Sequence, residues 1–370
     1  MRVLYVSKAL TVGAYRDKLR ALAAHVDIRA VVPARWGRQP VEPVDPDDPP
    51  VAFHDVLLDG YNHFHLYRSV QRILRAAGPD LVHIDEEPYS AVTAQLVFHC
   101  RRLAIPCCFF AAQNLDRSIP PPFGWLRSWV FRNVNGALAG TGAAARVLRQ
   151  RGFTGRLAVI AQMGVDPERF RPCPRARQRV RDSVGLGAGF LVGYGGRLVP
   201  EKGLPLLMRA MAAQREDAHL LLIGDGPERA VLEGAARDAG LARRVHFAGT
   251  IRSTAMAEWL AALDVLVLPS IRRPGRMEQF GRILVEAMAC GVPVIGSTCG
   301  EIPRVIGRAG IVVPEGDANA LADAIRRLHD DGAACDRLGR EGRQRVAEHF
   351  TNAAIAAATA GFYRDILEAA

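Results

Sequence analysis

Short apolar segments alternate with amphipathic segments along most of this chain of 370 residues, and this pattern constrains the fold more than any other feature. Strands that alternate with helices predict parallel sheets with helices on both faces, so we expect an α/β protein. The expected strands cover residues 2–7, 28–32, 81–84, 106–111, 136–140 and 157–161 in the first half, and 190–194, 219–223, 244–247, 264–269, 292–296 and 310–313 in the second.

Helical spacing of apolar residues fills most of the sequence between these strands. A proline-rich, acidic stretch at residues 33–50 is the exception and is expected to be an irregular loop. The expected helices cover residues 17–24, 68–77, 89–103 and 143–150, then 205–213, 228–239, 254–262 and 282–290, and finally the chain from 318 onward, with a last helix at 352–370.

A second stretch rich in proline and turn residues, at residues 164–174, interrupts the alternation and is expected to link two domains. We expect one Rossmann-like domain at residues 1–163 and another at 164–350, facing a central cleft. The helix at 351–370 is expected to pack back on the first domain. Ligands of open α/β sheets bind outside the carboxyl ends of the strands, so functional residues are expected there.

Composition excludes several other classes of protein. The hydrophobic content of 49% and charged content of 23% are those of a soluble globular chain, with no apolar run long enough to span a bilayer and no signal-peptide pattern, so we expect a cytoplasmic protein. The net charge of +10 favours anionic partners. Scattered arginines argue against nucleic acid, which leaves an anionic membrane surface or phosphate-bearing substrates. The seven cysteines show no zinc-site spacing.

A glycine-rich turn after the strand at 190–194 carries one of only three lysines in the chain. Gly196 allows close approach of a ligand, Arg197 offers a planar fork, and Lys202 adds a compact positive charge. This combination is suited to binding phosphate, although it is neither a P-loop nor a dinucleotide fingerprint. Lys8 and Lys18, the other two lysines, are expected to be ordinary surface residues.

Two carboxylates, Glu278 and Glu286, lie on either side of Gly281 at the start of an expected helix. Backbone N–H groups in the first turn of that helix, from Arg282 and Ile283, favour an anion such as phosphate. Carboxylates beside a phosphate are suited to accept hydrogen bonds from hydroxyl groups. Phosphate together with hydroxyls describes a sugar nucleotide. For the carboxylate pair taken alone, the simpler interpretation is favoured, in which Glu278 is a solvated loop charge and Glu286 a surface residue of an amphipathic helix.

Several of these segments together resemble the retaining glycosyltransferases of family 4, which have the GT-B fold. The segments are Gly196-Arg-Leu-Val-Pro-Glu-Lys-Gly, Gly224-Asp-Gly-Pro-Glu, Pro269-Ser, and Glu278-x7-Glu286 continuing as Ala-Met-Ala-Cys-Gly-Val-Pro-Val. The resemblance covers the second half almost continuously, in the expected order and spacing. It extends more loosely over the first half.

The resemblance implies a role for each matching residue. Arg197 and Lys202 would bind the donor diphosphate and neutralise the leaving group, Glu278 would contact the donor sugar, and Glu286 would accept from the ribose hydroxyls. The catalytic residues would be Arg197, Lys202 and Glu278. The donor would be bound by Gly13, Gly196, Arg197, Lys202, Gly224, Gly281, Arg282, Ile283 and Glu286.

The first half departs from the family pattern at two places. The usual double glycine after the first strand is Gly13-Ala14, and the place where family members often carry a histidine reads Phe110-Ala-Ala-Gln113-Asn114. A glutamine cannot share a proton as histidine can, whereas transfer in which the donor phosphate takes the acceptor proton needs no base there. His83, Gln113 and Asn114 are the candidate acceptor-binding residues.

The expected function is transfer of a hexose from a nucleotide-diphosphate sugar to a lipid-linked, saccharide or small-molecule acceptor. No metal or cofactor is expected, because Asp45-Pro-Asp47 lies in the proline-rich loop, away from the other motifs. The alternatives are a sugar-nucleotide epimerase of the same architecture, which would carry extra carboxylates in the first domain, and a non-catalytic nucleotide-sugar-binding protein. Residues 119–132 carry two tryptophans beside arginines. This segment predicts peripheral membrane contact, the lining of an acceptor groove, or a helix packed by its aromatic face into the first domain.

Overall fold

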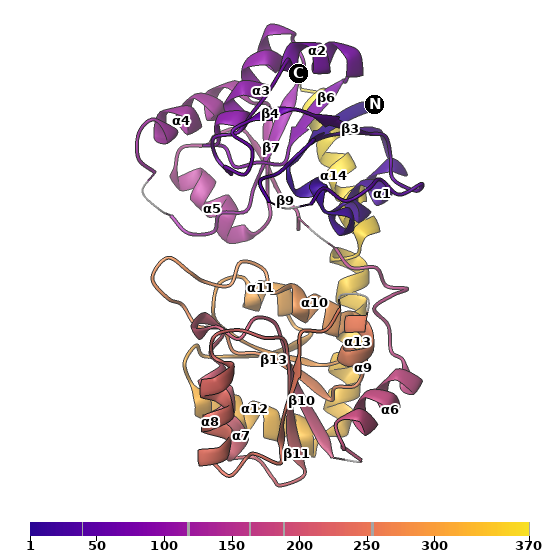
Figure 1. The fold of residues 1–370 in the computed structure, drawn as a ribbon, viewed down its shortest axis with the longest axis vertical. Helices are drawn as coiled ribbons and strands as arrows, with labels where there is room; N and C mark the ends of the chain where they lie inside the picture. The colour runs from indigo at the N-terminus through magenta and orange to yellow at the C-terminus, as the bar shows by residue number, and fades with distance from the viewer. Residues whose placement is uncertain (39, 117–118, 163, 188, 253–254, 370) are drawn as a thin grey trace. The chain divides into compact units, whose positions relative to one another are not determined.

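The structure is a computed structural model, and it describes residues 1–38, 40–116, 119–162, 164–187, 189–252 and 255–369. The chain divides into two compact units (Figure 1). The N-terminal unit contains Met1–Gly164 and Asn352–Ala370, and the C-terminal unit is Val165–Thr351. This division lies beside the predicted boundary at residue 163, which itself falls outside the described residues.

The N-terminal unit contains a parallel sheet of seven strands in the order β3-β2-β1-β6-β7-β8-β9. A separate antiparallel pair, β4 (Val56–Leu57) with β5 (Leu66–Tyr67), precedes β6 in the chain. The strands of the main sheet are β1 (Arg2–Val6), β2 (Asp27–Pro33), β3 (Val51–His54), β6 (Leu81–Ile84), β7 (Cys107–Ala111), β8 (Gly136–Ala139) and β9 (Arg156–Val159).

Helices cover both faces of this sheet. One apolar core lies under α1 (Asp17–Ala23) and α14 (Asn352–Leu367), which pack against each other. The other core lies under α2 (Val70–Ala77), α3 (Ala91–Arg102), α4 (Phe123–Asn133) and α5 (Gly142–Gln150). Figure 1 shows α14, in yellow, beside α1 although the two helices come from opposite ends of the chain. The last helix therefore completes the first unit.

The C-terminal unit contains a parallel sheet of six strands in the order β12-β11-β10-β13-β14-β15. The chain winds outward from β10 in one direction and then returns to β13 on the other side of β10. The strand order therefore reverses between β10 and β13, which is where doubly wound sheets form a ligand-binding crevice. The strands are β10 (Phe190–Gly195), β11 (Ala218–Ile223), β12 (Val245–Gly249), β13 (Val265–Leu268), β14 (Val294–Ser297) and β15 (Gly310–Val313).

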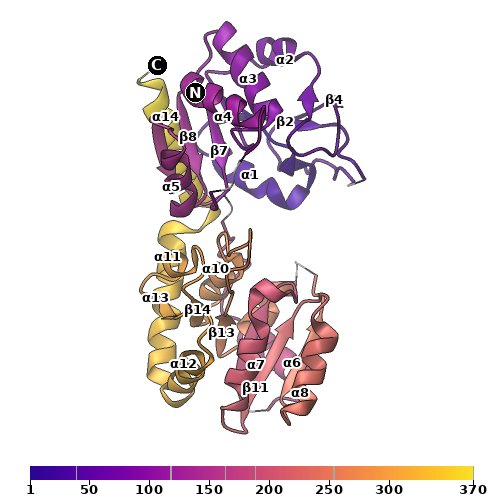
Figure 2. The ribbon, with the colours of Figure 1, turned by 90° about the vertical axis from the view of Figure 1, so that its left-hand side faces the viewer.

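Helices also surround this second sheet, as Figure 2 shows from the side. Helix α7 packs against α8 and α12, and α10 packs against α9 and α13. The helices are α6 (Pro174–Ser183), α7 (Leu204–Ala212), α8 (Arg229–Asp238), α9 (Met256–Ala261), α10 (Arg282–Ala289), α11 (Ile302–Ile306), α12 (Ala318–Asp330) and α13 (Gly332–His349). Within the described residues, no helix is both long and apolar enough to cross a membrane.

The α/β fold with parallel sheets is confirmed, and each predicted strand lies within two residues of an observed one. The first residue of the helix predicted at 254–262 lies outside the described residues, and α9 covers the later part of that prediction. Residue 370, the end of the last predicted helix, also lies outside the described residues. Strands β3, β4 and β5 and helices α6 and α11 were missed. Helix α6 has the sequence PRARQRVRDS, whose buried apolar residues are only Ala176 and Val180, so its apolar periodicity is weak.

Candidate functional site

The point of strand reversal in the C-terminal unit brings together two predicted site residues that lie far apart in the chain. Lys202 ends a short 3-10 turn (Pro200–Lys202) after β10, and Glu278 lies in the loop after β13. Lys202 Nζ is 2.6 Å from Glu278 Oε2, and Ser270 Oγ donates to the same oxygen at 2.9 Å. Because β10 and β13 are neighbours, their carboxyl ends place a cation, a carboxylate and a hydroxyl in one small site.

Glycines hold the loops of this edge close together. Gly224, with a φ of 135°, lies so near the turn after β10 that a Cβ atom built on it would be 2.0 Å from the carbonyl oxygen of Gly196. A Cβ atom on Gly203 would be 2.2 Å from the carbonyl oxygen of Pro269. Side chains at these two positions would force the loops apart, so the glycines define the shape of the site.

Arg197 presents its guanidinium to solvent from the same turn. The side chain is 75% exposed, and its Nη2 lies 4.0 Å from Glu201 Oε1, which pairs more closely with Arg276 Nη1 at 3.0 Å. The backbone below it is fixed, because the hydroxyl of Tyr194 donates to the carbonyl oxygen of Arg197 at 2.8 Å. The backbone of Arg197 is therefore held in place, while its exposed guanidinium can bind an anion.

Gly300 packs closely against the backbone of the loop that carries Glu278. A Cβ atom at Gly300 would be 2.0 Å from the carbonyl oxygen of Glu278, and the N–H of Glu301 donates to that oxygen at 3.3 Å. Gly281 is the N-cap residue of α10 and has a φ of 81°. Because it has no side chain, it cannot accept from the first N–H groups of the helix. The first-turn N–H groups of Arg282 and Ile283 thus start a helix at the edge where the sequence predicted an anion.

Glu286 lies on α10, one turn after Arg282. Its side chain is 11% exposed, and Arg282 Nε lies 2.8 Å from Glu286 Oε1. Burial raises the pKa of the Glu286 carboxyl above its ordinary value, while Arg282 and Arg169 act in the opposite direction. This is a nearly buried acceptor of hydrogen bonds rather than the solvated surface charge that was the simpler alternative.

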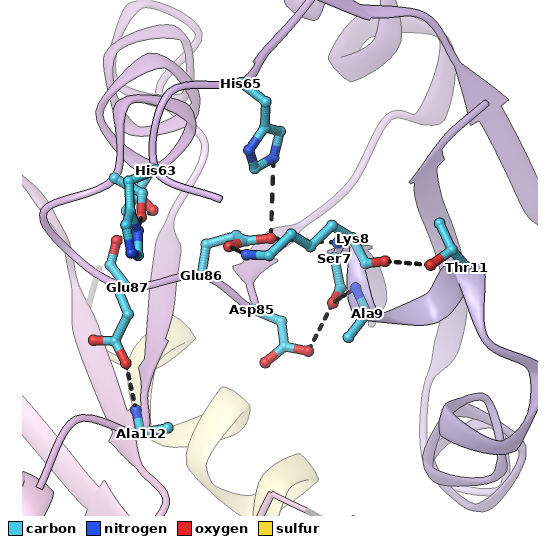
Figure 3. Close-up of polar contacts among 12 residues, drawn as sticks. Ser7, Lys8, Ala9, Thr11, His63, His65, Asp85, Glu86, Glu87 and Ala112 are labelled. Carbon is cyan, nitrogen blue, oxygen red and sulfur yellow. Dashed lines mark hydrogen bonds and ion pairs between the residues drawn. The ribbon is translucent and has the colours of Figure 1, made fainter. Parts of the chain in front are cut away.

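The N-terminal unit has its own polar edge, formed by three acids that follow β6 (Figure 3). Asp85 accepts from Ser7 Oγ at 2.9 Å, from Lys18 Nζ at 2.8 Å and from Gln162 Nε2 at 3.2 Å. Burial alone would raise the pKa of this carboxyl, but Lys18 and the hydrogen bond from Ser7 hold it well below its ordinary value. Asp85 is thus a fully satisfied structural anion.

Glu86, the second acid, forms an ion pair with Lys8 and is buried. Burial raises the pKa of Glu86 to about 7 against the effect of Lys8. His65 Nε2 lies 4.0 Å from Glu86 Oε1, and burial followed by Lys8 lowers the pKa of His65 to about 4. The prediction that Lys8 and Lys18 are ordinary surface residues was therefore wrong, because each neutralises an acid that follows β6.

The candidate acceptor residues are placed differently from one another. His83 is 2% exposed, its Nδ1 lies 2.6 Å from the hydroxyl of Tyr363, and its ring stacks on Tyr5. Burial lowers the pKa of His83 to about 3, so this histidine is a neutral core residue that ties α14 to the sheet. Gln113 lies at the end of β7, where its side chain donates to the carbonyl of Leu115, and Asn114 is buried.

Gly13, the predicted diphosphate contact in the first domain, donates its N–H to Glu42 Oε2 at 2.6 Å. A carboxylate therefore occupies the donor that was expected to hold phosphate. No local pattern indicated Glu42, because it lies 29 residues away in the proline-rich loop. Arg16 holds that loop in place through the carbonyl oxygens of Glu42 and Pro43 and the carboxylate of Asp48.

The fold and the site define a class of protein that binds its ligand at the point of strand reversal of an α/β sheet, and comparison with known sequences identifies the family. Residues 189–331 match the model of the glycosyl transferases group 1, and residues 15–169 match glycosyltransferase family 4. The chain is 30% identical over 282 residues to the 2-deoxystreptamine glucosyltransferase of Streptomyces kanamyceticus. The aligned residues cover 74% of this chain and 70% of that protein. The chain belongs to the family 4 glycosyltransferases, as the sequence motifs predicted.

A second relative is aligned over a shorter length. The GDP-mannose-dependent alpha-(1-6)-phosphatidylinositol monomannoside mannosyltransferase of Mycolicibacterium smegmatis is 36% identical over 187 residues, 49% of each chain. Solved structures agree on the GT-B fold alone. A glycosyltransferase from Rickettsia africae has a TM-score of 0.81 at 17% identity, covering 100% of this chain and 99% of that one. Anabaena HepE in complex with UDP has a TM-score of 0.77 at 20% identity, covering 99% and 100%.

Proposed function

We propose that this protein is a retaining glycosyltransferase that moves a hexose from a nucleotide-diphosphate sugar to an acceptor hydroxyl, without a metal ion. The observation that carries the proposal is the group of Lys202, Arg197 and Glu278 at the reversal point of the C-terminal sheet. Departure of the nucleoside diphosphate leaves negative charge on phosphate. Fixed cations placed where that charge develops lower the barrier to the reaction.

In this proposal two kinds of group bind the donor: positively charged side chains with backbone N–H groups, and carboxylates. Arg197 and Lys202 bind the diphosphate, together with the backbone N–H groups near Gly281, Arg282 and Ile283. Glu278 accepts from the hydroxyls of the transferred sugar, and Glu286 accepts from the ribose. Gly196 and Gly224 would let the phosphate approach the backbone closely, because neither carries a side chain.

The acceptor is proposed to bind the N-terminal unit. The named acceptors of relatives support a compound that contains a cyclitol, because 2-deoxystreptamine, D-inositol 3-phosphate and phosphatidylinositol monomannoside all do. Lipid-linked and small soluble acceptors both belong to this set. The UDP complexes of a protein of the same fold support nucleotide-sugar binding as such, without identifying the base used here.

The experiment is a transfer assay in which each of UDP-glucose and GDP-mannose is offered with each cyclitol acceptor. The expected result is a glycosylated product whose anomeric configuration, read by NMR, equals that of the donor. A product of inverted configuration would contradict the retaining mechanism. Conversion of the donor into an isomeric nucleotide sugar without any acceptor would instead identify an epimerase.

A further inference from the structure

Two ion pairs of opposite polarity join the turn after β10 to the loop after β13. Lys202 of the turn lies 2.6 Å from Glu278 of the loop, Nζ to Oε2. Glu201 of the turn lies 3.0 Å from Arg276 of the loop, Oε1 to Nη1. The N–H of Ile271 also donates to the carbonyl oxygen of Glu201 at 2.9 Å. Two neighbouring residues of the turn therefore each have a partner of opposite charge in the same loop.

Glu201 is shared between two arginines. Its Oε1 lies 3.0 Å from Arg276 and also 4.0 Å from Nη2 of Arg197. The side chain of Glu201 is 15% exposed, whereas both guanidinium groups extend into solvent. A hydrogen bond from its own backbone N–H, followed by Arg276 and Arg197, holds the pKa of Glu201 below its ordinary value, against the effect of burial. A charged carboxylate therefore lies within reach of the arginine proposed to bind the diphosphate.

The backbone of Arg276 is set by a tight turn that does not depend on its side chain. Arg273 and Arg276 exchange backbone hydrogen bonds of 2.9 Å across Pro274 and Gly275, and Gly275 has a φ of 69°. Proline followed by a glycine of positive φ is the pair that a type II turn favours at its centre. Replacing the side chain of Arg276 should therefore leave the backbone of the loop unchanged.

The charges around the turn favour an anion only while Arg276 is present. A carboxylate beside Arg197 repels a phosphate and competes with it for the same guanidinium. The paired groups are three cations and two carboxylates: Arg197, Lys202 and Arg276, with Glu201 and Glu278. Without Arg276 these charges would balance, and Arg197 would be the remaining ion-pair partner of Glu201 among the described residues.

We infer that Arg276 is a positioning residue of the donor site. It neutralises Glu201 and draws that carboxylate away from Arg197, which leaves the guanidinium of Arg197 available to the diphosphate. The inference rests on the proposed function and extends it to two residues outside the predicted site, Arg276 and Glu201. Both act through Arg197 rather than by contact with the donor.

Isothermal titration calorimetry of the full chain with UDP, GDP and ADP tests this role. Arg276→Gln removes the charge, and we expect the dissociation constant of the nucleotide that binds to rise about two- to fivefold at low ionic strength, the range for an exposed ion pair. Adding Glu201→Gln to Arg276→Gln removes the competing carboxylate as well. The double variant should therefore regain the affinity of the wild type, and Glu201→Gln alone should bind more tightly than the wild type.

Salt gives a second readout that a purely structural role would not change. Interactions between exposed charges weaken as ionic strength rises, so the difference between Arg276→Gln and the wild type should shrink between about 0.01 M and about 0.5 M salt. Arg272→Gln is the matched control, because it removes an exposed positive charge from the same loop and leaves the pair of Glu201 with Arg276 intact. We expect this control to bind the nucleotide as the wild type does.

Failure of the inference can be distinguished from failure of the proposed function. A dissociation constant of Arg276→Gln equal to that of the wild type would overturn the inference while nucleotide binding persists. Equal weakening in Arg276→Gln and in the double variant would also overturn it, because Arg276 would then hold the loop or contact the nucleotide itself. A wild-type protein that binds none of UDP, GDP and ADP would instead contradict the proposed function.

Discussion

Lys202 Nζ and Glu278 Oε2 lie 2.6 Å apart although 76 residues separate them in the chain. The contact joins the turn after β10 to the loop after β13, and it balances the charge of the cation proposed to bind the diphosphate. A bound diphosphate would compete with Glu278 for this lysine. Donor binding would then free Glu278 to accept from the sugar hydroxyls, so the two proposed roles depend on each other.

Replacing Lys202 should abolish most of the transfer and leave the fold intact. Lys202→Ala removes the compact charge beside the leaving group, and loss of one such group typically costs about 10²–10³ in kcat. Steady-state kinetics with a nucleotide sugar measure the loss, and circular dichroism checks the fold. Arg243→Ala is the control, because it removes an exposed positive charge just before β12, at the opposite end of the strands. Full activity in Lys202→Ala would rule out the phosphate assignment.

Replacing Glu286 should weaken nucleotide binding more than catalysis. Glu286→Gln removes the charged acceptor proposed for the ribose, and we expect the dissociation constant of the nucleoside diphosphate to rise about tenfold or more, measured by isothermal titration calorimetry. Glu233→Gln on α8 is matched, because Glu233 forms the same i,i+4 pair with Arg229 at 2.9 Å. Equal nucleotide affinity in Glu286→Gln and the wild type would remove Glu286 from the donor site.

The loop that carries Glu278 should be sensitive to a single methyl group behind it. Gly300→Ala places a Cβ atom 2.0 Å from the carbonyl oxygen of Glu278, so the loop must move and donor affinity should fall. Gly316→Ala is the control, since its φ of 83° is also positive but nothing lies within 4 Å of the added atom. The control should cost only the backbone strain of about 1–2 kcal/mol. Equal effects of the two variants on donor affinity would argue against this coupling.

Helix α14 should be held to the N-terminal unit partly through the hydrogen bond between Tyr363 and His83. Tyr363→Phe leaves the buried His83 Nδ1 without that partner, and we expect it to lower the free energy of unfolding by about 1–3 kcal/mol, measured by urea denaturation. Tyr61→Phe removes a hydroxyl from a residue that is 63% exposed and serves as the control. A stability of Tyr363→Phe equal to that of the wild type would show that this contact contributes nothing.

His65 should make the protein less stable in acid. Its folded pKa of about 4 lies below its ordinary value of 6.5, so the unfolded state binds the proton more readily and stability is lost as the pH falls from about 6.5 toward about 4. His65→Phe removes this loss. Between pH 7.5 and pH 5 the variant should gain about 2 kcal/mol relative to the wild type, because one pKa unit corresponds to about 1.4 kcal/mol. A stability difference that does not change with pH would contradict the buried neutral state.

The sequence predicted the C-terminal unit better than the N-terminal unit for a physical reason. Gly196 and Gly224 lie directly after β10 and β11, and Lys202 and Glu278 lie in the loops that follow β10 and β13. Topology then brings these loops to one edge of one parallel sheet. Their convergence follows from strand order, and the motifs that carry them are short and contiguous.

The N-terminal contacts depend instead on pairs that are distant in the chain and have no local signal. Lys8 meets Glu86 across 78 residues, and His83 meets Tyr363 across 280. Apolar periodicity also gives little indication of a short edge strand such as β3 or of the arginine-rich helix α6.

Nucleotide binding by the wild type and by Lys202→Ala tests whether Lys202 holds the diphosphate of the donor. A thermal-shift titration with UDP, GDP and ADP and their sugars needs no knowledge of the acceptor, and ligand at about 100 times its dissociation constant stabilises the folded state by about 2.7 kcal/mol. We expect a saturable rise in melting temperature with one of these nucleotides, a much weaker rise in Lys202→Ala, and an unchanged rise in Arg243→Ala. No rise with any of them, or an equal rise in Lys202→Ala and the wild type, would rule out a nucleotide diphosphate bound at Lys202.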